Sequence, residues 1–169
     1  AALPLIGGMV GGVIGGLLGD RLVKRNKGVT TWARRITGSF GKGFAALLLG
    51  GSLLVIDQPL VFALVLCVAK VGADISLATR WAAVTDIGGA AIATLFALIN
   101  AAAIGAGIIG SLVYGKIVPD MSGAVAPPPS DWSLVIYVVI GMYVLCSLTW
   151  LIPDTTKPLF LDPADGPTN

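Results

Sequence analysis

The feature that most constrains this chain is a series of apolar runs longer than the core of a soluble domain uses. Of its 169 residues, 56% are hydrophobic and only 12% are charged, and the mean hydropathy is +0.91. A helix needs roughly 20 apolar residues to cross a bilayer, and runs of about this length lie at 1–18, 39–56, 59–79, 90–113 and 132–152. Such unbroken runs favour helices over the short alternating strands of a membrane barrel. We therefore predict an all-α polytopic membrane protein with five spans in the lipid bilayer.

The basic residues gather between the first two runs and predict how the chain is oriented. Seven of them fall in the segment 19–38, predicted to be a loop, or at its edge: Arg21, Lys24, Arg25, Lys27, Arg34, Arg35 and Lys42. Arg80 in the predicted loop 80–89 and Lys157 in the tail 153–169 lie on the same predicted side, and Lys116 lies on the other. Lys and Arg concentrate on the cytoplasmic side of membrane proteins. We therefore predict a cytoplasmic basic loop and tail with residue 1 outside, and we interpret the cluster as a topology signal rather than a nucleic-acid site.

Glycines recur every four residues in the first run, in two adjacent rows: Gly7, Gly11 and Gly15, and Gly8, Gly12 and Gly16. A four-residue step places each row on one face of a helix, and small residues let membrane helices approach closely. The rows predict tight helix packing, with a sliding or bending movement along them as the alternative.

Several kinds of chemistry are excluded by the residue types that the chain lacks. It has no histidine, and its nine acidic residues are all aspartates. Cys67 and Cys146 lie inside predicted spans, where cysteine behaves as a small hydrophobic residue. Because no nucleophile–base pair and no cluster of metal ligands is visible, we expect neither an enzyme nor a metal ion or cofactor.

Lys70 is the exception to the uncharged character of the runs. It lies eleven residues after Pro59, roughly 16 Å along a helix, where ionisable groups usually face a cavity or a partner and mark substrate or proton routes. Asp74 follows four residues later, at a spacing suited to an ion pair. Three interpretations stay open: a working site in which Lys70 attracts an anionic substrate and Asp74 exchanges a proton, a structural ion pair, or a pair near the cytoplasmic rim of a shorter span.

Asn100 is a second polar residue deep in a run, ten residues into the fourth one. Its amide can both donate and accept hydrogen bonds. We expect it either to contact the substrate or to join two helices by a hydrogen bond.

A short motif follows the glycine rows. A glycine is followed four residues later by an aspartate, then by an arginine and two further basic residues: Gly16, Asp20, Arg21, Lys24 and Arg25. At the end of a span this order suits a latch, in which the aspartate pairs with nearby bases in one conformation and releases them in another. The stretch resembles the motif that the major facilitator superfamily carries between helices two and three and between helices eight and nine. Val23 replaces the second glycine of that motif, as is common in its second copy. The resemblance implies that residues 1–169 are a partial C-terminal transmembrane domain, helices eight to twelve of a twelve-helix fold whose N-terminal half is missing.

A second stretch reads Asp-Ile-Gly-Gly and has an asparagine on the run that follows it: Asp86, Gly88, Gly89 and Asn100. It looks like the loop and eleventh helix of the anion:cation symporter branch of that superfamily, although Ala90 and Ala91 replace the polar pair usual there. The resemblance implies a secondary active transporter of a bacterial inner membrane. Such a protein moves a small organic anion, such as a sugar acid, by alternating access coupled to protons or another cation.

A different class of protein also fits the five runs. In this alternative the chain is a stand-alone five-span membrane scaffold or subunit with no transport activity. Such a protein would need neither a charge in the middle of a span nor a latch. The Asp20-Arg21 motif favours the transporter, and a segment with further spans and a matching motif ahead of residue 1 would distinguish the two.

Overall fold

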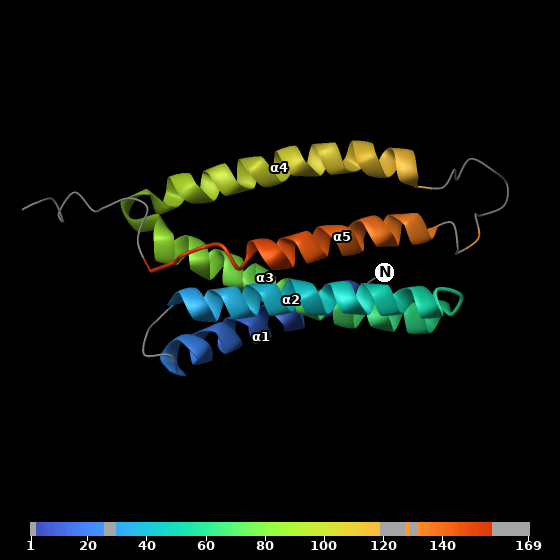
Figure 1. Ribbon diagram of the computed structural model, residues 1–169, viewed down its shortest axis with the longest axis horizontal. Helices are drawn as coiled ribbons and strands as arrows, with labels where there is room; N and C mark the ends of the chain where they lie inside the picture. Colours follow the sequence, from blue (N-terminus) through green and yellow to red (C-terminus); the bar gives the residue numbers. More distant parts are fainter. Residues whose placement is uncertain (1–2, 26–29, 119–127, 129–131, 157–169) are drawn as a thin grey trace, which may run out of the picture.

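The computed structural model describes residues 3–25, 30–118, 128 and 132–156 of the chain. The α-helices in this part are α1 (Leu3–Arg25), α2 (Thr30–Ser52), α3 (Pro59–Gly88), α4 (Ile92–Ile117) and α5 (Ser133–Thr149). Short 3₁₀ turns follow α2 at Leu53–Val55 and α3 at Gly89–Ala91. Figure 1 shows the helices lying lengthwise, each running opposite to the one before it. The predicted all-α class is confirmed for the described residues.

Large apolar side chains cover the outside of the molecule, as expected of helices that contact lipid. Met9, Leu47 and Ile104 expose 75%, 77% and 67% of their surface. The helical stretches Leu3–Arg25, Thr30–Val55 and Pro59–Ile117 are each long and apolar enough to cross a membrane, and Ser133–Thr149 is a shorter apolar helix. These helices are compatible with a membrane location.

Helices α1 and α3 pack backbone to backbone through one of the two glycine rows. Gly7, Gly11 and Gly15 are buried, and each lies against a backbone carbonyl of α3, on Cys67, Val71 and Ile75 in turn. A Cβ atom at Gly15 would lie 2.6 Å from the Ile75 oxygen, closer than real Cβ atoms come. In the other row, a Cβ atom at Gly12 or Gly16 would have no atom of another residue within 4 Å. The predicted tight packing is therefore present: one row packs along its length, and the other contributes only Gly8, which lies against Asp74.

Helices α2 and α3 are joined by small residues and by one hydroxyl pair. Gly41 and Gly72 face each other across the interface. The Thr79 hydroxyl donates to the Thr37 hydroxyl at 2.9 Å, and both residues are almost fully buried. The apolar core consists mostly of alanines and has few larger side chains: Ala33, Ala45, Ala46, Leu49, Ala69, Ala73, Ile75, Ala83 and Val84.

Helix α5 is fastened to α2 on the side away from α1. The Ser39 and Ser147 hydroxyls each donate to the backbone carbonyl of the other residue at 2.8 Å. The Trp150 ring lies on Gly38, where a side chain would occupy the same space. This contact places the end of α5 beside the middle of α3, where the charged residues lie.

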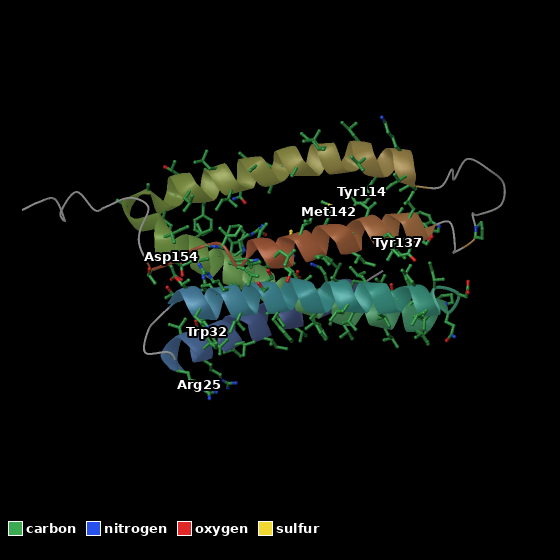
Figure 2. The ribbon with its side chains drawn as sticks, in the orientation of Figure 1. Arg25, Trp32, Tyr114, Tyr137, Met142 and Asp154 are labelled. Atoms are coloured by element: carbon green, nitrogen blue, oxygen red, sulfur yellow. The ribbon has the colours of Figure 1, made fainter. Side chains whose placement is uncertain are left out.

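Helix α4 stands apart from the rest of the bundle (Figure 1) and contains no buried residue. Gly89, at φ 48°, ends α3 in a conformation that only glycine adopts readily, so the chain can reverse. The Trp81 and Phe96 rings stack at 5.0 Å near this turn. At the other end Tyr114 reaches from α4 toward Met142 of α5 (Figure 2), and its hydroxyl donates to the sulfur at 3.9 Å.

The helices extend beyond the predicted spans at the end of the bundle that carries most of the basic residues. The segment 19–38, predicted to be a loop, is helical at 19–25 and 30–38, and α3 continues through most of the predicted loop 80–89. Arginine, lysine and alanine favour helix, so a charge ends an apolar run without ending the helix. Hydropathy therefore located the apolar part of each helix, but not the helix ends. Lys27, Lys157 and the rest of the tail beyond 156 lie outside the described residues.

Candidate functional site

Lys70 and Asp74 lie one helical turn apart in the middle of α3. The Lys70 Nζ atom is 2.6 Å from Asp74 Oδ1. The lysine side chain is 39% exposed and the aspartate 14%. Gly8 of α1 covers the aspartate so closely that a side chain at this position would meet its Oδ2 atom. The predicted contact is confirmed, and the two helices enclose its acidic member.

A cavity of about 380 Å³ opens beside this ion pair, between α2, α3 and α5. It contains three basic groups and one carboxylate, so its formal charge is +2 if each group is ionised. The lining residues are Lys42, Lys70, Asp74, Ser76, Leu77, Arg80, Cys146, Thr149 and Trp150. An excess of positive charge in a site with apolar walls attracts anions.

Lys42 and Arg80 contribute the two positive charges that no carboxylate balances. The Lys42 Nζ atom lies 4.8 Å from the centre of the Tyr143 ring, and Arg80 Cζ lies 4.4 Å from the centre of the Trp81 ring. Among the described residues, neither takes part in an ion pair, and the buried Nε atom of Arg80 has no hydrogen-bond partner. Both cations rest on aromatic faces, which leaves their charges available to a ligand.

Sequence reasoning missed these two residues as members of the site because it counted both with the cytoplasmic basic side. Lys42 interrupts the apolar run 39–56, which was a usable signal. Arg80 directly follows the run 59–79 and gave no such signal. Lys42 reaches the cavity because α2 packs against α3, whereas Arg80 lies on α3 itself, ten residues after Lys70.

A second, smaller cavity of about 200 Å³ adjoins Lys70. Its lining is apolar apart from the lysine and one tyrosine: Pro4, Leu49, Leu66, Ala69, Lys70, Val139 and Tyr143. Pro4 lies near the start of α1, at the opposite end of that helix from Arg25. Lys70 therefore borders two cavities, of which the one with Arg80 is polar and the one with Pro4 is apolar.

Asn100 is not part of this site. It lies on α4, where it is exposed, and it lines neither of the cavities beside Lys70. Its depth in the run predicted that it contacts the substrate or joins two helices by a hydrogen bond. Depth along a helix does not determine which neighbouring helices a residue faces. Helix α4 packs only lightly on α3, the helix that carries Lys70.

At the end of the bundle, the ion pair joins two helices and involves residues other than those of the predicted latch. Arg34 Nε of α2 donates to Asp86 Oδ2 of α3 at 2.9 Å, and their side chains are only 9% and 20% exposed. The Arg34 guanidinium also passes over Gly19 of α1, where a Cβ atom would lie 3.1 Å from Nη1. One arginine therefore contacts three helices.

The residues of the latch motif themselves lie on the outside of α1. Asp20, Arg21, Lys24 and Arg25 are exposed and form no ion pair within the described part of the chain. Gly16 is exposed as well and contacts nothing that a side chain would meet. Gly88, from the second motif, packs against Ile92, and Gly89 makes the turn that follows α3.

The segment after α5 binds the start of α2. The Arg35 guanidinium donates to the carbonyls of Ile152 and Pro153 at 3.1 and 2.8 Å. The Asp154 carboxylate accepts hydrogen bonds from the Thr156 hydroxyl and backbone N–H and from the Thr31 hydroxyl, which lower its pKa from 3.8 to about 2. Figure 2 shows Asp154 and Arg25 at the same end of the molecule.

No protein-family model, no curated protein and no solved structure matches the chain. Within the described residues, no three histidine, cysteine, aspartate or glutamate side chains come together as metal ligands. The charged cavity is therefore the feature of the described residues that bears most directly on function.

Proposed function

We propose that the chain is part of a secondary active transporter that moves a small organic anion, such as a sugar acid, by alternating access. The observation that carries this proposal is the Lys70–Asp74 ion pair inside an apolar helical bundle, beside a cavity that has two further cations. Charged groups in such surroundings are costly and usually serve substrate or ion transport. The resemblance of the Asp20-Arg21 motif to the major facilitator superfamily supports the same class and assigns α1 to α5 as helices eight to twelve.

In this proposal the substrate competes with Asp74 for Lys70. An anion that binds Lys70 leaves the aspartate without its cation, so anion binding and protonation of Asp74 are linked. The cavities on the two sides of Lys70 are the halves of a route that opens first to one side of the membrane and then to the other. The missing N-terminal half of the polypeptide completes the route.

The proposed location is a bacterial inner membrane, with five spans, the basic end of the bundle cytoplasmic and residue 1 outside. The charges of Arg25, Arg34, Arg35 and Arg80 support this orientation because basic residues concentrate on the cytoplasmic side. The Arg34–Asp86 pair joins α2 and α3 at that end. It is the contact that would hold the cytoplasmic side closed.

The test is sugar-acid uptake into proteoliposomes that contain the full polypeptide with these helices, with and without a proton gradient. Lys70→Ala is expected to reduce uptake at least about tenfold, since a charge-assisted contact is lost. Asp74→Asn is expected to retain anion exchange but to lose the response to the gradient. Lys116→Ala, which removes the same charge from an exposed position on α4, is the matched control and should transport normally. Normal uptake by Lys70→Ala would overturn the proposal.

A second candidate function is a membrane scaffold without transport activity, and the bare surface of α4 favours it. This helix contains no buried residue, so it has a long apolar face for another protein. The same uptake experiment separates the two candidates. A scaffold shows no gradient-driven uptake of any sugar acid, and its Lys70→Ala variant keeps whatever partner the protein binds.

A further inference from the structure

We infer that the cavity beside Lys70 recognises a dianion, with Arg80 binding the second anionic group. This inference rests on the proposed transport function and specifies its substrate class. The cavity has three cations and one aspartate. With Asp74 ionised, a monoanion leaves this site with a formal charge of +1 and a dianion leaves it neutral. Once Asp74 is protonated the site carries +3, and a dianion again compensates more of that charge than a monoanion does. Because uncompensated charge is unfavourable in apolar surroundings, the site favours the dianion.

Arg80 has the properties of a group that binds a carboxylate or phosphate. Its guanidinium presents several donors in a planar fork that matches such an anion. Its Nε atom is buried and has no hydrogen-bond partner among the described residues. Such an unpaired donor is costly unless a ligand accepts its hydrogen bond. The Trp81 ring beneath the guanidinium holds its plane in place without neutralising it.

The positions of the cations suit a ligand with charges at its two ends. Lys70 and Arg80 are ten residues apart on α3, about 15 Å along the helix axis, and both side chains border the same cavity. Lys42 enters from α2, and Trp150 of α5 closes the wall. One anionic group then binds Lys70 in competition with Asp74, and the other binds Arg80.

A dianionic group can reach this cavity as a soluble solute or as a lipid phosphate, and the depth of Lys70 favours the solute. The lysine lies in the middle of α3, near the midplane that a spanning helix of this length would have. Phosphate headgroups lie at the surface of a bilayer, so a lipid phosphate would bind Arg80 and would not reach Lys70. Nanodiscs of phosphatidylcholine with and without phosphatidic acid separate the two sources.

The experiment compares glucarate with gluconate, two six-carbon sugar acids that carry two carboxylates and one. Binding to the full polypeptide in phosphatidylcholine nanodiscs is measured by isothermal titration calorimetry at pH 7. We expect glucarate to bind at least about tenfold more tightly than gluconate, the gain of one charge-assisted contact. Arg80→Gln should remove this preference while changing gluconate binding little. Arg80→Lys, which keeps the charge and loses the fork, should retain part of it. Lys116→Gln, which removes one positive charge from an exposed position on α4, is the matched control and should behave as wild type.

The outcomes distinguish this inference from the proposed function. Equal affinity for the two acids, or an unchanged preference in Arg80→Gln, overturns the dianion site even where gluconate uptake depends on Lys70. A glucarate preference that depends on Arg80, without any uptake, supports the site and overturns the transport function. Glucarate binding that is lost when the nanodiscs contain phosphatidic acid, and kept when they do not, assigns the site to lipid phosphate. This result overturns the inference that the ligand is a soluble solute.

Discussion

The two ion pairs that the described residues form differ in burial, charge balance and the helices that they join. The Arg34–Asp86 pair joins two helices at the end of the bundle, is largely buried and balances one charge with one. The Lys70–Asp74 pair lies within one helix, has a lysine that is 39% exposed and borders a cavity with two further cations. The first arrangement is suited to holding helices together. The second is unbalanced and open, which suits a ligand that replaces one member.

The largest expected effect that separates the pairs is on stability. Asp86→Asn leaves Arg34 buried without a countercharge and should lower the free energy of unfolding by about 3 kcal/mol. Asp74→Asn leaves Lys70 unpaired but bordering an open cavity, so its cost should be smaller, about 1–2 kcal/mol. Unfolding in mixed micelles, followed by circular dichroism during titration with dodecyl sulfate, measures both.

A double variant provides the control for this comparison. Replacing both members, as Arg34→Leu with Asp86→Leu, removes the uncompensated charge and should recover part of the loss. Equal losses for Asp86→Asn and Asp74→Asn would mean that the two pairs do not differ in the way described.

A smaller effect concerns the space that α1 provides for the middle pair. Gly8→Ala pushes a methyl group against the Asp74 carboxylate and should cost about 1–2 kcal/mol of stability. Gly12→Ala meets nothing and should be neutral or stabilise by up to about 1 kcal/mol, since alanine favours helix over glycine. The same unfolding experiment measures both variants.

The origin of the Gly8 effect can be checked in a second background. When Asp74 is already alanine, Gly8→Ala should cost much less, because the carboxylate that it meets is gone. If Gly8→Ala lowers the free energy of unfolding equally in both backgrounds, the added methyl group meets another part of α3. Gly8 then does not define the space around Asp74.

The smallest effect is at the basic end of the bundle, where Asp154 holds the segment after α5 on α2. Its pKa is lowered to about 2, so its contribution to docking is complete above about pH 4 and is lost as the pH falls through about 2. Carbon-13 NMR of the Asp154 carboxyl group should give a titration midpoint near 2. Thr31→Val removes one donor and should raise that midpoint toward 3.8. A wild-type midpoint near 3.8 would contradict the hydrogen bonds described.

The sequence predicted features that depend on spacing within one helix. The contact between Lys70 and Asp74 follows from a step of four residues, and so does the row of glycines that packs against α3. Contacts between helices depend on how the helices turn and pair, which no spacing records. Arg34 belonged to the predicted basic cluster and Asp86 to the Asp-Ile-Gly-Gly motif, and neither pattern predicted that they pair. The basic cluster likewise did not place Lys42 at the cavity.

The glycine pairs of α1 repeat every four residues, so they do not define a unique alignment with α3. A displacement of α1 by one helical turn, about 5–6 Å, would bring Gly12 to the place where Gly8 now faces Asp74, with glycine again against the backbone of α3. The repeat ends at Gly19, which is the only one of these positions that an arginine, Arg34, crosses. The glycine spacing therefore does not by itself fix the alignment of α1 with α3, whereas the contact of Arg34 with Gly19 lies at one end of the interface only.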